Sequence, residues 1–297
     1  MKLLITGSCG FVGSNLVDML IEQGHDVVGI DDLSSDAHDQ FYFNSKATYH
    51  HHDVNDYVMC SEVFESHRPN AVFHLAAEAR IQNCIEDPGL CMNTNLMGTQ
   101  TMLDLCKKHH VDRFVFMSTS AVYGLQANPV QKEEDTTDCL NPYSLSKWFG
   151  ENLCKMYSKN YALDTVCFRG FNIYGNRQPT KGQYAPVIGI FQRQKRVGDT
   201  LTVIGDGEQR RDFIHVSDVC RGLIAGAFSK ETQNGEVYNL GTGKNYSVNE
   251  IAEMIGGKRE YLPQRQSESR STLADISKAK EKLGWNPHYD LSSKIWT

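Results

Sequence analysis

Short apolar segments alternate with amphipathic segments along the first half of the chain. Runs such as KLLIT (2–6) and AVFHLAA (71–77) are apolar almost throughout, which is typical of strands buried on both faces of a sheet. Between them, apolar residues recur at helical spacing. This alternation predicts an α/β fold, a doubly wound parallel sheet with helices on both faces. The predicted strands are 2–6, 26–30, 48–54, 71–77, 113–120 and 164–170, and the predicted helices are 13–23, 56–67, 91–110 and 143–161.

The alternation loosens from about residue 171, where glycine, proline and polar residues interrupt it, as in GNRQPTKGQYAP (175–186). This change predicts a smaller C-terminal lobe that is partly interleaved in sequence with the larger domain. The predicted larger domain is 1–170, with 209–230 returning to it, and the predicted lobe is 171–208 and 231–297.

Composition and charge exclude several classes of protein. The 297 residues are 40% hydrophobic and 22% charged, which is ordinary for a globular chain. The net charge is −6 and no run of Lys and Arg reaches five, so we expect no nucleic-acid partner. No apolar run approaches the roughly 18–20 residues of a membrane span, so no membrane partner is expected either. The start, MKLLITG, lacks the features of a signal peptide, which predicts a cytoplasmic protein.

The cysteines and histidines also favour a reducing compartment and no metal. The cysteines number nine, which is odd, and none forms a C-x-x-C pair, so reduced thiols are expected. His50, His51 and His52 stand together beside Asp53. No second cluster of ligands accompanies them, so the sequence predicts no metal site.

A glycine-rich segment, GSCGFVGS (7–14), joins the first predicted strand to the first predicted helix. Gly7, Gly10 and Gly13 permit a tight turn and let a diphosphate approach the backbone at the helix N-terminus. Their place between a strand and a helix predicts a dinucleotide site.

Acidic residues end the second and third predicted strands. A carboxylate at Asp31 or Asp32 is placed to hydrogen-bond the adenosine ribose and to repel the 2′-phosphate of NADP, so NAD is the predicted cofactor. The alternative is a solvated acidic loop, which suits Asp32 better than Asp31. Asp53 and Val54 are placed to meet the adenine ring, and a turn is the equal alternative for Asp53.

The segment PYSLSK (142–147) places Tyr143 and Lys147 four residues apart after a proline that suits a first helical turn. Residues at this spacing share one helix face. An ammonium about 5 Å from a phenol, at an effective dielectric of ~20, would stabilise the phenolate by ~3 kcal/mol, or about two pKa units. The positive charge of the nicotinamide adds to this effect, so the pair predicts a phenol poised as a general base near neutral pH. The alternative is an ordinary surface helix.

The chain resembles the extended short-chain dehydrogenase/reductases, and among them the nucleotide-sugar 4-epimerases of the UDP-glucose 4-epimerase type. The resemblance covers almost the whole chain. It rests on GSCGFVGS (7–14), HLAA (74–77), STSAVYG (118–124), YSLSK (143–147), RGFNIYGNRQ (169–178), DGEQRRDFIHVSDV (206–219), YNLGTG (238–243) and ADISKAKEKLGW (274–285).

This resemblance implies a Rossmann domain with bound NAD and a lobe that binds the sugar nucleotide. It implies that Tyr143 is the base, that Lys147 activates it and that Thr119 orients the reacting proton, although Ser118 and Ser120 are neighbouring hydroxyls. The implied cofactor-binding residues are Gly7, Gly10, Phe11, Val12, Gly13, Asp31, Asp32, Asp53, Val54, Leu75, Ala76, Ala77, Asn95, Tyr143 and Lys147. The implied substrate-binding residues are Ser120, Asn172, Arg211, Arg265, Glu268 and Thr272.

The implied reaction is the epimerisation of a UDP-sugar at C4 through a transient 4-keto intermediate. Nucleotide-sugar 4,6-dehydratases and decarboxylases of the same fold are the alternative, but they place an acid soon after the catalytic Thr. Here Ser120 and Ala121 follow Thr119, which favours epimerisation. A non-catalytic nucleotide-sugar-binding protein is a further alternative, disfavoured because Tyr143, Lys147 and Thr119 are all present.

The resemblance also bears on the sugar and on assembly. Thr272 lies where a small residue admits a 2-acetamido group, so UDP-N-acetylglucosamine is expected beside UDP-glucose, and UDP-glucuronate stays open. A homodimer is implied through a four-helix contact made by 92–109 and 143–161 of each subunit. The apolar faces of these helices would serve core packing equally well.

Overall fold

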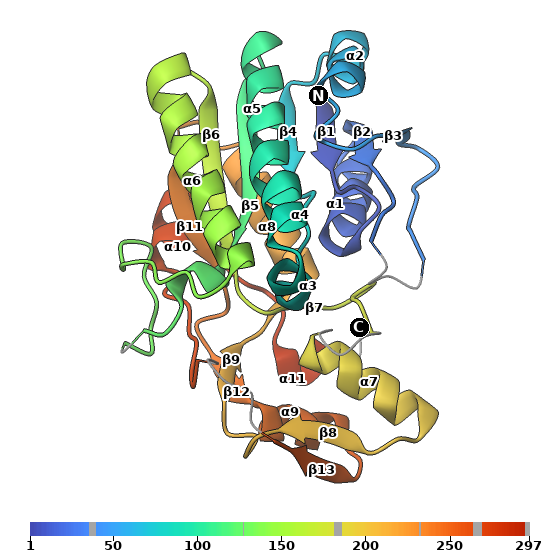
Figure 1. Cartoon of the computed structure of the whole chain (residues 1–297), viewed down its shortest axis with the longest axis vertical. Coiled ribbons are helices and arrows are strands. Elements are labelled where there is room, and N and C mark those ends of the chain that lie inside the picture. Colours follow the sequence, from blue (N-terminus) through green and yellow to red (C-terminus); the bar gives the residue numbers. More distant parts are fainter. Residues whose placement is uncertain (36–39, 127, 181–185, 232, 264–268, 295–297) are drawn as a thin grey trace.

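The computed structural model describes residues 1–35, 40–126, 128–180, 186–231, 233–263 and 269–294. Its larger domain is built on a seven-stranded parallel sheet in the order β11-β6-β5-β4-β1-β2-β3. In Figure 1 the strands of this sheet end toward the smaller lobe below. The strands are β1 (Lys2–Thr6), β2 (Asp26–Asp31), β3 (Thr48–His51), β4 (Ala71–His74), β5 (Arg113–Thr119), β6 (Asp164–Gly170) and β11 (Glu236–Leu240).

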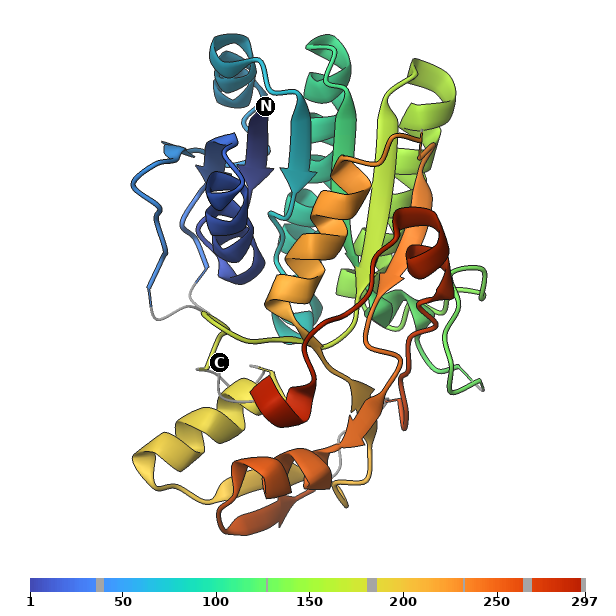
Figure 2. The same cartoon turned by 180° about the vertical axis from the view of Figure 1, so that it is seen from behind.

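Helices cover both faces of this sheet, which confirms the predicted doubly wound α/β architecture. One face packs against α1 (Phe11–Glu22), α8 (Val216–Ala227) and α10 (Ser277–Leu283), which lie in front of the sheet in Figure 2. The other face packs against α2 (Tyr57–His67), α5 (Gly98–Lys108) and α6 (Pro142–Tyr161). Each face buries its own apolar cluster, which explains why the central strands are apolar on both sides.

The helix predicted over 91–110 is interrupted. It consists of α4 (Pro88–Met92), a π-helical turn η1 (Asn93–Met97) and α5. The local sequence is helical throughout, and the wider turn follows from the bonds that the buried Asn95 makes outside the helix, described below. Such π turns are frequent at functional sites.

The smaller lobe has a core of its own. Its elements pack around buried residues such as Phe191, Val203 and Ile251. They are α7 (Val187–Val197), β8 (Leu201–Ile204), β9 (Arg210–Asp212), β12 (Asn245–Ser247), α9 (Val248–Ile255), β13 (Arg259–Leu262) and α11 (Leu291–Lys294). The remaining described elements are α3 (Ile81–Glu86), the 3-10 helix η2 (Ser120–Tyr123), β7 (Ile173–Tyr174) and β10 (Ile214–His215).

The predicted range 231–297 of the lobe needs a correction. β11 pairs with β6 in the main sheet, and α10 packs against β11 and α8 in the larger domain. The physical reason is burial: Tyr238, Asn239 and Leu240 are enclosed when β11 extends the sheet. The chain therefore returns to the larger domain three times, at 216–227, 236–240 and 277–283.

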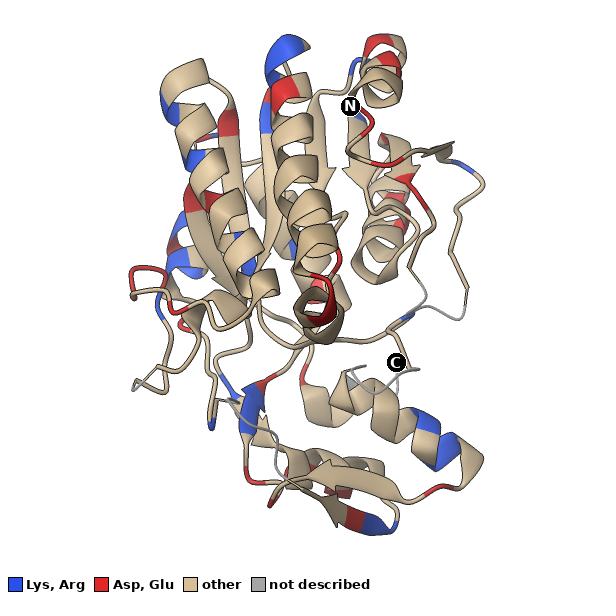
Figure 3. Ribbon diagram, viewed as in Figure 1, with Lys and Arg blue, Asp and Glu red and all other residues tan. Residues whose placement is uncertain are grey.

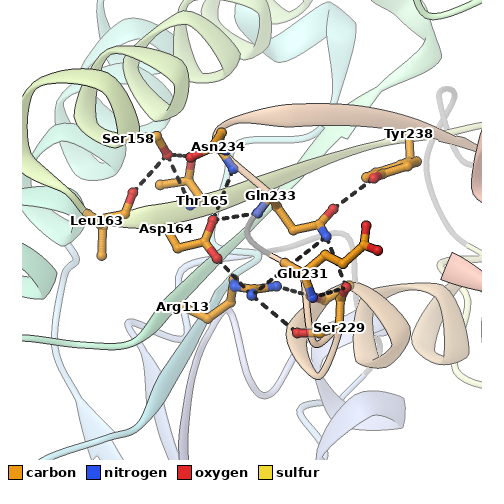
Figure 4. A network of polar contacts seen from close by, with 11 residues as sticks. Arg113, Ser158, Leu163, Asp164, Thr165, Ser229, Glu231, Gln233, Asn234 and Tyr238 are labelled. Atoms are coloured by element: carbon orange, nitrogen blue, oxygen red, sulfur yellow. Dashed lines mark hydrogen bonds and ion pairs between the residues drawn. The ribbon is translucent and has the colours of Figure 1, made fainter. Parts of the chain in front are cut away.

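A network of polar contacts closes the edge of the sheet where its strands begin (Figure 4). Arg113, the first residue of β5, forms an ion pair of 2.7 Å with Asp164, the first residue of β6. The Arg113 guanidinium also donates to the carbonyls of Gly226, Ser229 and Glu231. These bonds attach the segment that follows α8 to the start of the two central strands.

Among the described residues, no helix is long and apolar enough to cross a membrane.

Candidate active site

Asp31 and Thr119, two of the predicted site residues, lie at the edge of the sheet where its strands end. Thr6, Asp31, His74, Thr119 and Gly170 are the last residues of β1, β2, β4, β5 and β6. This edge faces the smaller lobe in Figure 1. Ligands of doubly wound folds bind outside the carboxyl ends of the strands, so this is the candidate site.

The glycine-rich turn between β1 and α1 tolerates only glycine at two positions. Gly7 has a φ of +67°, and a Cβ there would lie 2.8 Å from the backbone nitrogen of Ala76. A Cβ on Gly13 would lie 1.9 Å from the carbonyl oxygen of Gly7. Gly10 begins α1 without a side-chain cap, and the first turn of α1 carries no acidic residue. The exposed N–H groups and the helix dipole at this turn suit a diphosphate.

The Asp31 carboxylate supports this turn. It accepts a hydrogen bond of 2.8 Å from the backbone N–H of Cys9 and one of 2.9 Å from that of Leu33. A carboxylate at this position is placed to accept hydrogen bonds from ribose hydroxyls as well. The solvated alternative does not describe Asp31, because its side chain is tied to the glycine-rich turn.

The other two acidic residues form local turns. The Asp32 side chain accepts from the backbone N–H and the hydroxyl of Ser34. The Asp53 side chain accepts from the backbone N–H and the amide of Asn55, so the turn foreseen as one alternative for Asp53 is present. Val54 is buried in the apolar cluster on the α2 side of the sheet.

Tyr143 stands in the first turn of α6, which an Asn141–Ser144 capping box and Pro142 begin. The Thr119 hydroxyl, at the end of β5, lies near the Tyr143 phenol and acts to lower the pKa of the phenol. It also accepts a hydrogen bond of 3.1 Å from the Ala121 N–H.

The neighbouring hydroxyl of Ser118 is committed elsewhere. It donates to the Glu151 carboxylate at 2.5 Å, and Glu151 in turn pairs with the buried Arg169 at 2.7 Å. This leaves the Ser118 hydroxyl unsuited to act on the phenol, whereas Thr119 is the hydroxyl that affects the pKa of Tyr143.

Lys147 follows Tyr143 by one turn of α6, and its ammonium is held by contacts with the end of β5. It is buried, donates to the Met117 carbonyl at 2.9 Å and lies 5.0 Å from the centre of the Phe116 ring. Burial lowers the pKa of Lys147 to about 8. The ammonium is still mostly protonated at neutral pH.

The expected lowering of the Tyr143 pKa does not come from the protein's own groups alone. Burial raises the pKa of Tyr143 to about 12, the Thr119 hydroxyl opposes this, and Cys84, Cys91 and Glu78 raise it further. Spacing alone could not reveal this, because it says nothing about how deeply the phenol is buried.

Asn95 lies in η1 and connects three segments of the site. Its side chain accepts from the backbone N–H of Glu78 at 2.8 Å and donates to the Glu78 carbonyl at 3.0 Å. It also donates to the Ser146 hydroxyl at 3.0 Å, and that hydroxyl donates to the Tyr143 carbonyl at 2.8 Å. Asn95 therefore braces both the segment after β4 and the start of α6.

Glu78 and Ser146 were missed by the sequence reasoning. A signal was available for Glu78, because it directly follows the HLAA motif at the end of a buried strand. Its carboxylate forms an ion pair of 3.1 Å with Arg80, and both side chains are mostly covered. Ser146 gives no signal of its own in the sequence.

Three of the predicted substrate residues lie around β9. The Asn172 amide donates to the carbonyl of Asp212 at 2.9 Å, and the Thr272 N–H donates to that of Arg210 at 3.1 Å. Arg211 is the middle residue of β9. In Figure 3 this strand is largely blue and lies where the lobe meets the larger domain.

Three predicted substrate residues remain, and these are Ser120, Arg265 and Glu268. Ser120 begins η2, directly after Thr119, and its side chain is half-buried. Arg265 and Glu268 lie outside the described residues. The neighbouring Arg210 pairs with Glu250 at 2.8 Å, partly exposed, and is a surface ion pair.

The chain was compared with known proteins. The family model described as GDP-mannose 4,6 dehydratase matches residues 4–295. A putative UDP-glucose 4-epimerase of Methanocaldococcus jannaschii is 35% identical over 300 residues, covering 99% of this chain and 95% of that protein. The structure of UDP-glucose 4-epimerase with UDP-glucose from Thermotoga maritima has a TM-score of 0.93 at 33% identity, covering 99% of this chain and 96% of that one. UDP-glucuronic acid 4-epimerase from Bacillus cereus, in complex with UDP-glucuronic acid and NAD, has a TM-score of 0.89 at 30% identity, covering 99% of this chain and 96% of that one.

Proposed function

Because the chain belongs to the extended short-chain dehydrogenase/reductases, as a nucleotide-sugar epimerase of that family, we propose that it is an NAD-dependent 4-epimerase of a UDP-sugar. The observation that carries the proposal is the hydroxyl pair of Tyr143 and Thr119, with Lys147 one turn further along α6. This pair lies at the edge of the sheet that faces the lobe with Arg211.

The reaction removes the hydride from C4 and the proton from O4, which leaves a 4-ketone. The sugar then presents its opposite face and regains both. Tyr143 takes the O4 proton and later returns it, with the Thr119 hydroxyl orienting the transfer. When bound, NAD supplies the acceptor of the C4 hydride and a positive charge that lowers the pKa of the Tyr143 phenol.

The residues of the larger domain fit this cofactor. The glycine-rich turn leaves no space for a Cβ at Gly7 or Gly13 and presents the N-terminus of α1 to a diphosphate. Phe11, Val12 and Gly13 would offer their backbone N–H groups there, and Asp31 its carboxylate to the ribose. Leu75, Ala76 and Ala77 would line the path from this turn to Tyr143. The glycine-rich turn and the Asp31 carboxylate are both present in the structure of this chain.

The carboxylates near Tyr143 favour epimerisation over dehydration. A dehydratase needs an acid to expel water from the sugar, and Ser120 and Ala121 occupy the positions after Thr119. Glu78 is near enough to raise the Tyr143 pKa, but its carboxylate is paired with Arg80. The match to a dehydratase family model keeps dehydration as the second candidate.

For the sugar, we propose UDP-glucose and UDP-N-acetylglucosamine. Support comes from Thr272, a small side chain that adjoins β9 through its N–H bond to Arg210. Arg211 and Arg265 would hold the diphosphate as guanidinium forks, and Glu268 would help to grip the uridine ribose. Asn172 and Ser120 would contact the sugar.

We further propose a cytoplasmic homodimer built on α6 and on the helix formed by α4, η1 and α5. Leu90, Met97 and Phe149 on these elements are 52%, 51% and 37% exposed, which leaves an apolar surface for a partner. Leu103 of α5 is fully buried and belongs to the core. Sedimentation with Met97→Lys would test the contact, since a buried unpaired charge should yield monomers.

The function is tested with purified protein given UDP-glucose, UDP-N-acetylglucosamine or UDP-glucuronate in separate tubes, while the anomeric protons are followed by NMR. The C4 epimer should appear with UDP-glucose or UDP-N-acetylglucosamine. If a 4-keto-6-deoxy product or a decarboxylated pentose appeared instead, the protein would be a dehydratase or a decarboxylase and not an epimerase. No turnover in any tube, with NAD added, would overturn the proposal.

A further inference from the structure

A chain of buried hydrogen bonds crosses the interior beneath the site, and His74 is its centre. His74 ends β4 and is fully buried. Its Nδ1 lies 2.7 Å from the Thr6 hydroxyl and its Nε2 lies 3.0 Å from the Thr99 hydroxyl. The reaction proposed above uses none of these three side chains.

The neighbours of the two hydroxyls fix the direction of every bond. The Thr6 oxygen accepts from the backbone N–H groups of Leu75 and Ala76, both at 3.2 Å, so its own proton points to His74 Nδ1. The Thr99 hydroxyl donates to the Asn95 carbonyl at 2.6 Å, so its oxygen is left to accept from His74 Nε2. His74 is therefore the tautomer with its proton on Nε2, and only a neutral ring can accept at Nδ1.

The surroundings of the ring favour this neutral state. Burial lowers the pKa of His74 to about 3, and the nearby Lys147 ammonium contributes in the same direction. The ring also stacks on Phe116 at 6.0 Å, the same ring that the Lys147 ammonium approaches. His74 thus keeps one tautomer throughout the pH range in which the protein is folded.

The two ends of the chain reach different parts of the site. At one end, Thr6 holds the N–H groups of Leu75 and Ala76, and the Ala76 nitrogen is the atom against which Gly7 packs. At the other end, Thr99 holds the carbonyl of Asn95, whose side chain braces Glu78 and, through Ser146, the start of α6.

We propose that His74 is a positioning residue, whose neutral Nε2–H form holds the turn at Leu75 and Ala76 with one nitrogen and the Asn95 segment with the other. The effect of His74 on function rests on the proposed function. The bond at Nδ1 would set the cofactor-binding turn, and the bond at Nε2 would set the position of Tyr143. The bonds themselves do not depend on that function.

Two substitutions of His74 separate the bond made by Nδ1 from the bond made by Nε2. His74→Asn keeps an acceptor near the position of Nδ1 and loses the donor to Thr99. His74→Gln keeps a donor near the position of Nε2 and loses the acceptor for Thr6. His109→Gln is the matched control, since His109 follows α5 near the opposite edge of the sheet and touches Ser61 instead.

We expect His74→Gln to raise the Kd for NAD about tenfold with little change in kcat, because a buried hydroxyl loses its partner beside the turn. His74→Asn should lower kcat about tenfold and leave the Kd for NAD within about twofold. Both His74 variants should have a lower Tm, and the control should change neither kinetic parameter. Equal changes of Kd and kcat in the two variants, or a change in Tm alone, would overturn the proposal.

A second readout does not need catalysis. In ¹⁵N spectra of histidine-labelled protein, His74 should show an unprotonated Nδ1 and a protonated Nε2 with no titration between pH 5 and 9. The Ala76 backbone amide should shift in His74→Gln and the Asn95 side-chain amide in His74→Asn. A protonated Nδ1, or a titration near the ordinary histidine pKa, would overturn the assignment. If the wild-type chain neither binds NAD nor turns over a UDP-sugar, the proposed function fails while these spectra still decide the inference.

Discussion

Both edges of the main sheet carry polar networks, but only the network beside the lobe contains a lysine whose pKa is shifted toward neutrality and which can exchange its proton. At the edge where the strands begin, Arg113 and Asp164 neutralise each other and their bonds end on backbone groups. At the edge where the strands end, Tyr143 is partly buried and Lys147 is buried, and the pKa values of both are strongly shifted. The Lys147 ammonium donates to a backbone carbonyl.

This difference separates a network that stabilises from one that can react. A paired charge has no reason to exchange its proton, whereas a buried unpaired group changes its proton affinity when a charged ligand arrives. We therefore expect substitutions at the first edge to alter the free energy of unfolding and substitutions at the second edge to alter turnover.

The largest effect is expected for Tyr143→Phe. Loss of the group that takes the O4 proton should lower kcat about a thousandfold, within the range usual for general bases. Phenylalanine keeps the ring and removes only the hydroxyl, so the Tm should change little. Turnover assays and thermal unfolding of the same preparation check both statements. A variant that keeps a tenth of the activity would remove Tyr143 from this role.

At the opposite edge, Arg113→Leu should lower the free energy of unfolding by about 3 kcal/mol, because it leaves the mostly buried Asp164 carboxylate unpaired. The kcat of the folded variant should stay within about twofold. Urea unfolding measures the first quantity and initial rates the second. The double variant Arg113→Leu, Asp164→Leu is the control and should regain part of the lost stability. A large loss of kcat at full stability would contradict the separation of the two edges.

The pH dependence of turnover should report on Lys147. Its pKa is lowered to about 8, so the ammonium is present below this value and is lost as the pH rises through it. We expect kcat/KM to fall above about pH 8, and Lys147→Arg, which stays charged, to abolish this fall at a reduced rate. A profile that is flat to pH 10 in the wild-type protein would show that the ammonium charge is not needed.

The smallest effect is expected for an exposed pair near the Arg113 edge. Lys108 lies 3.6 Å from Glu65, and the two side chains are 46% and 61% exposed. Lys108→Ala should change the free energy of unfolding by about 0.5 kcal/mol or less and leave kcat unaltered. Unfolding in urea measured beside Arg113→Leu would compare a buried with an exposed ion pair near the same edge.

The strands of the larger domain were predictable because burial on both faces makes them apolar throughout, and β6 has the predicted bounds 164–170. The break at η1 was not, because the segment around Asn95 has an ordinary helical pattern and the wider turn depends on contacts with Glu78 and Ser146. β11 was missed because its short apolar run follows a segment rich in polar residues.

The candidate site shows the same limit. Spacing placed Tyr143, Lys147 and Thr119 together, since one helix and the end of one strand suffice to bring them near each other. It could not give the direction of the Tyr143 pKa, which depends on burial, or the partner of Lys147, which is the carbonyl of Met117.

We propose that the sheet edge beside the lobe inverts C4 of a UDP-sugar by removing and returning the same hydride. The decisive measurement uses UDP-glucose deuterated at C4, incubated with the protein until NMR shows a constant product ratio. We predict that the C4 epimer appears with deuterium still bound to C4. Deuterium at C6 of a 4-keto-6-deoxy sugar, or deuterium lost to water, would contradict it.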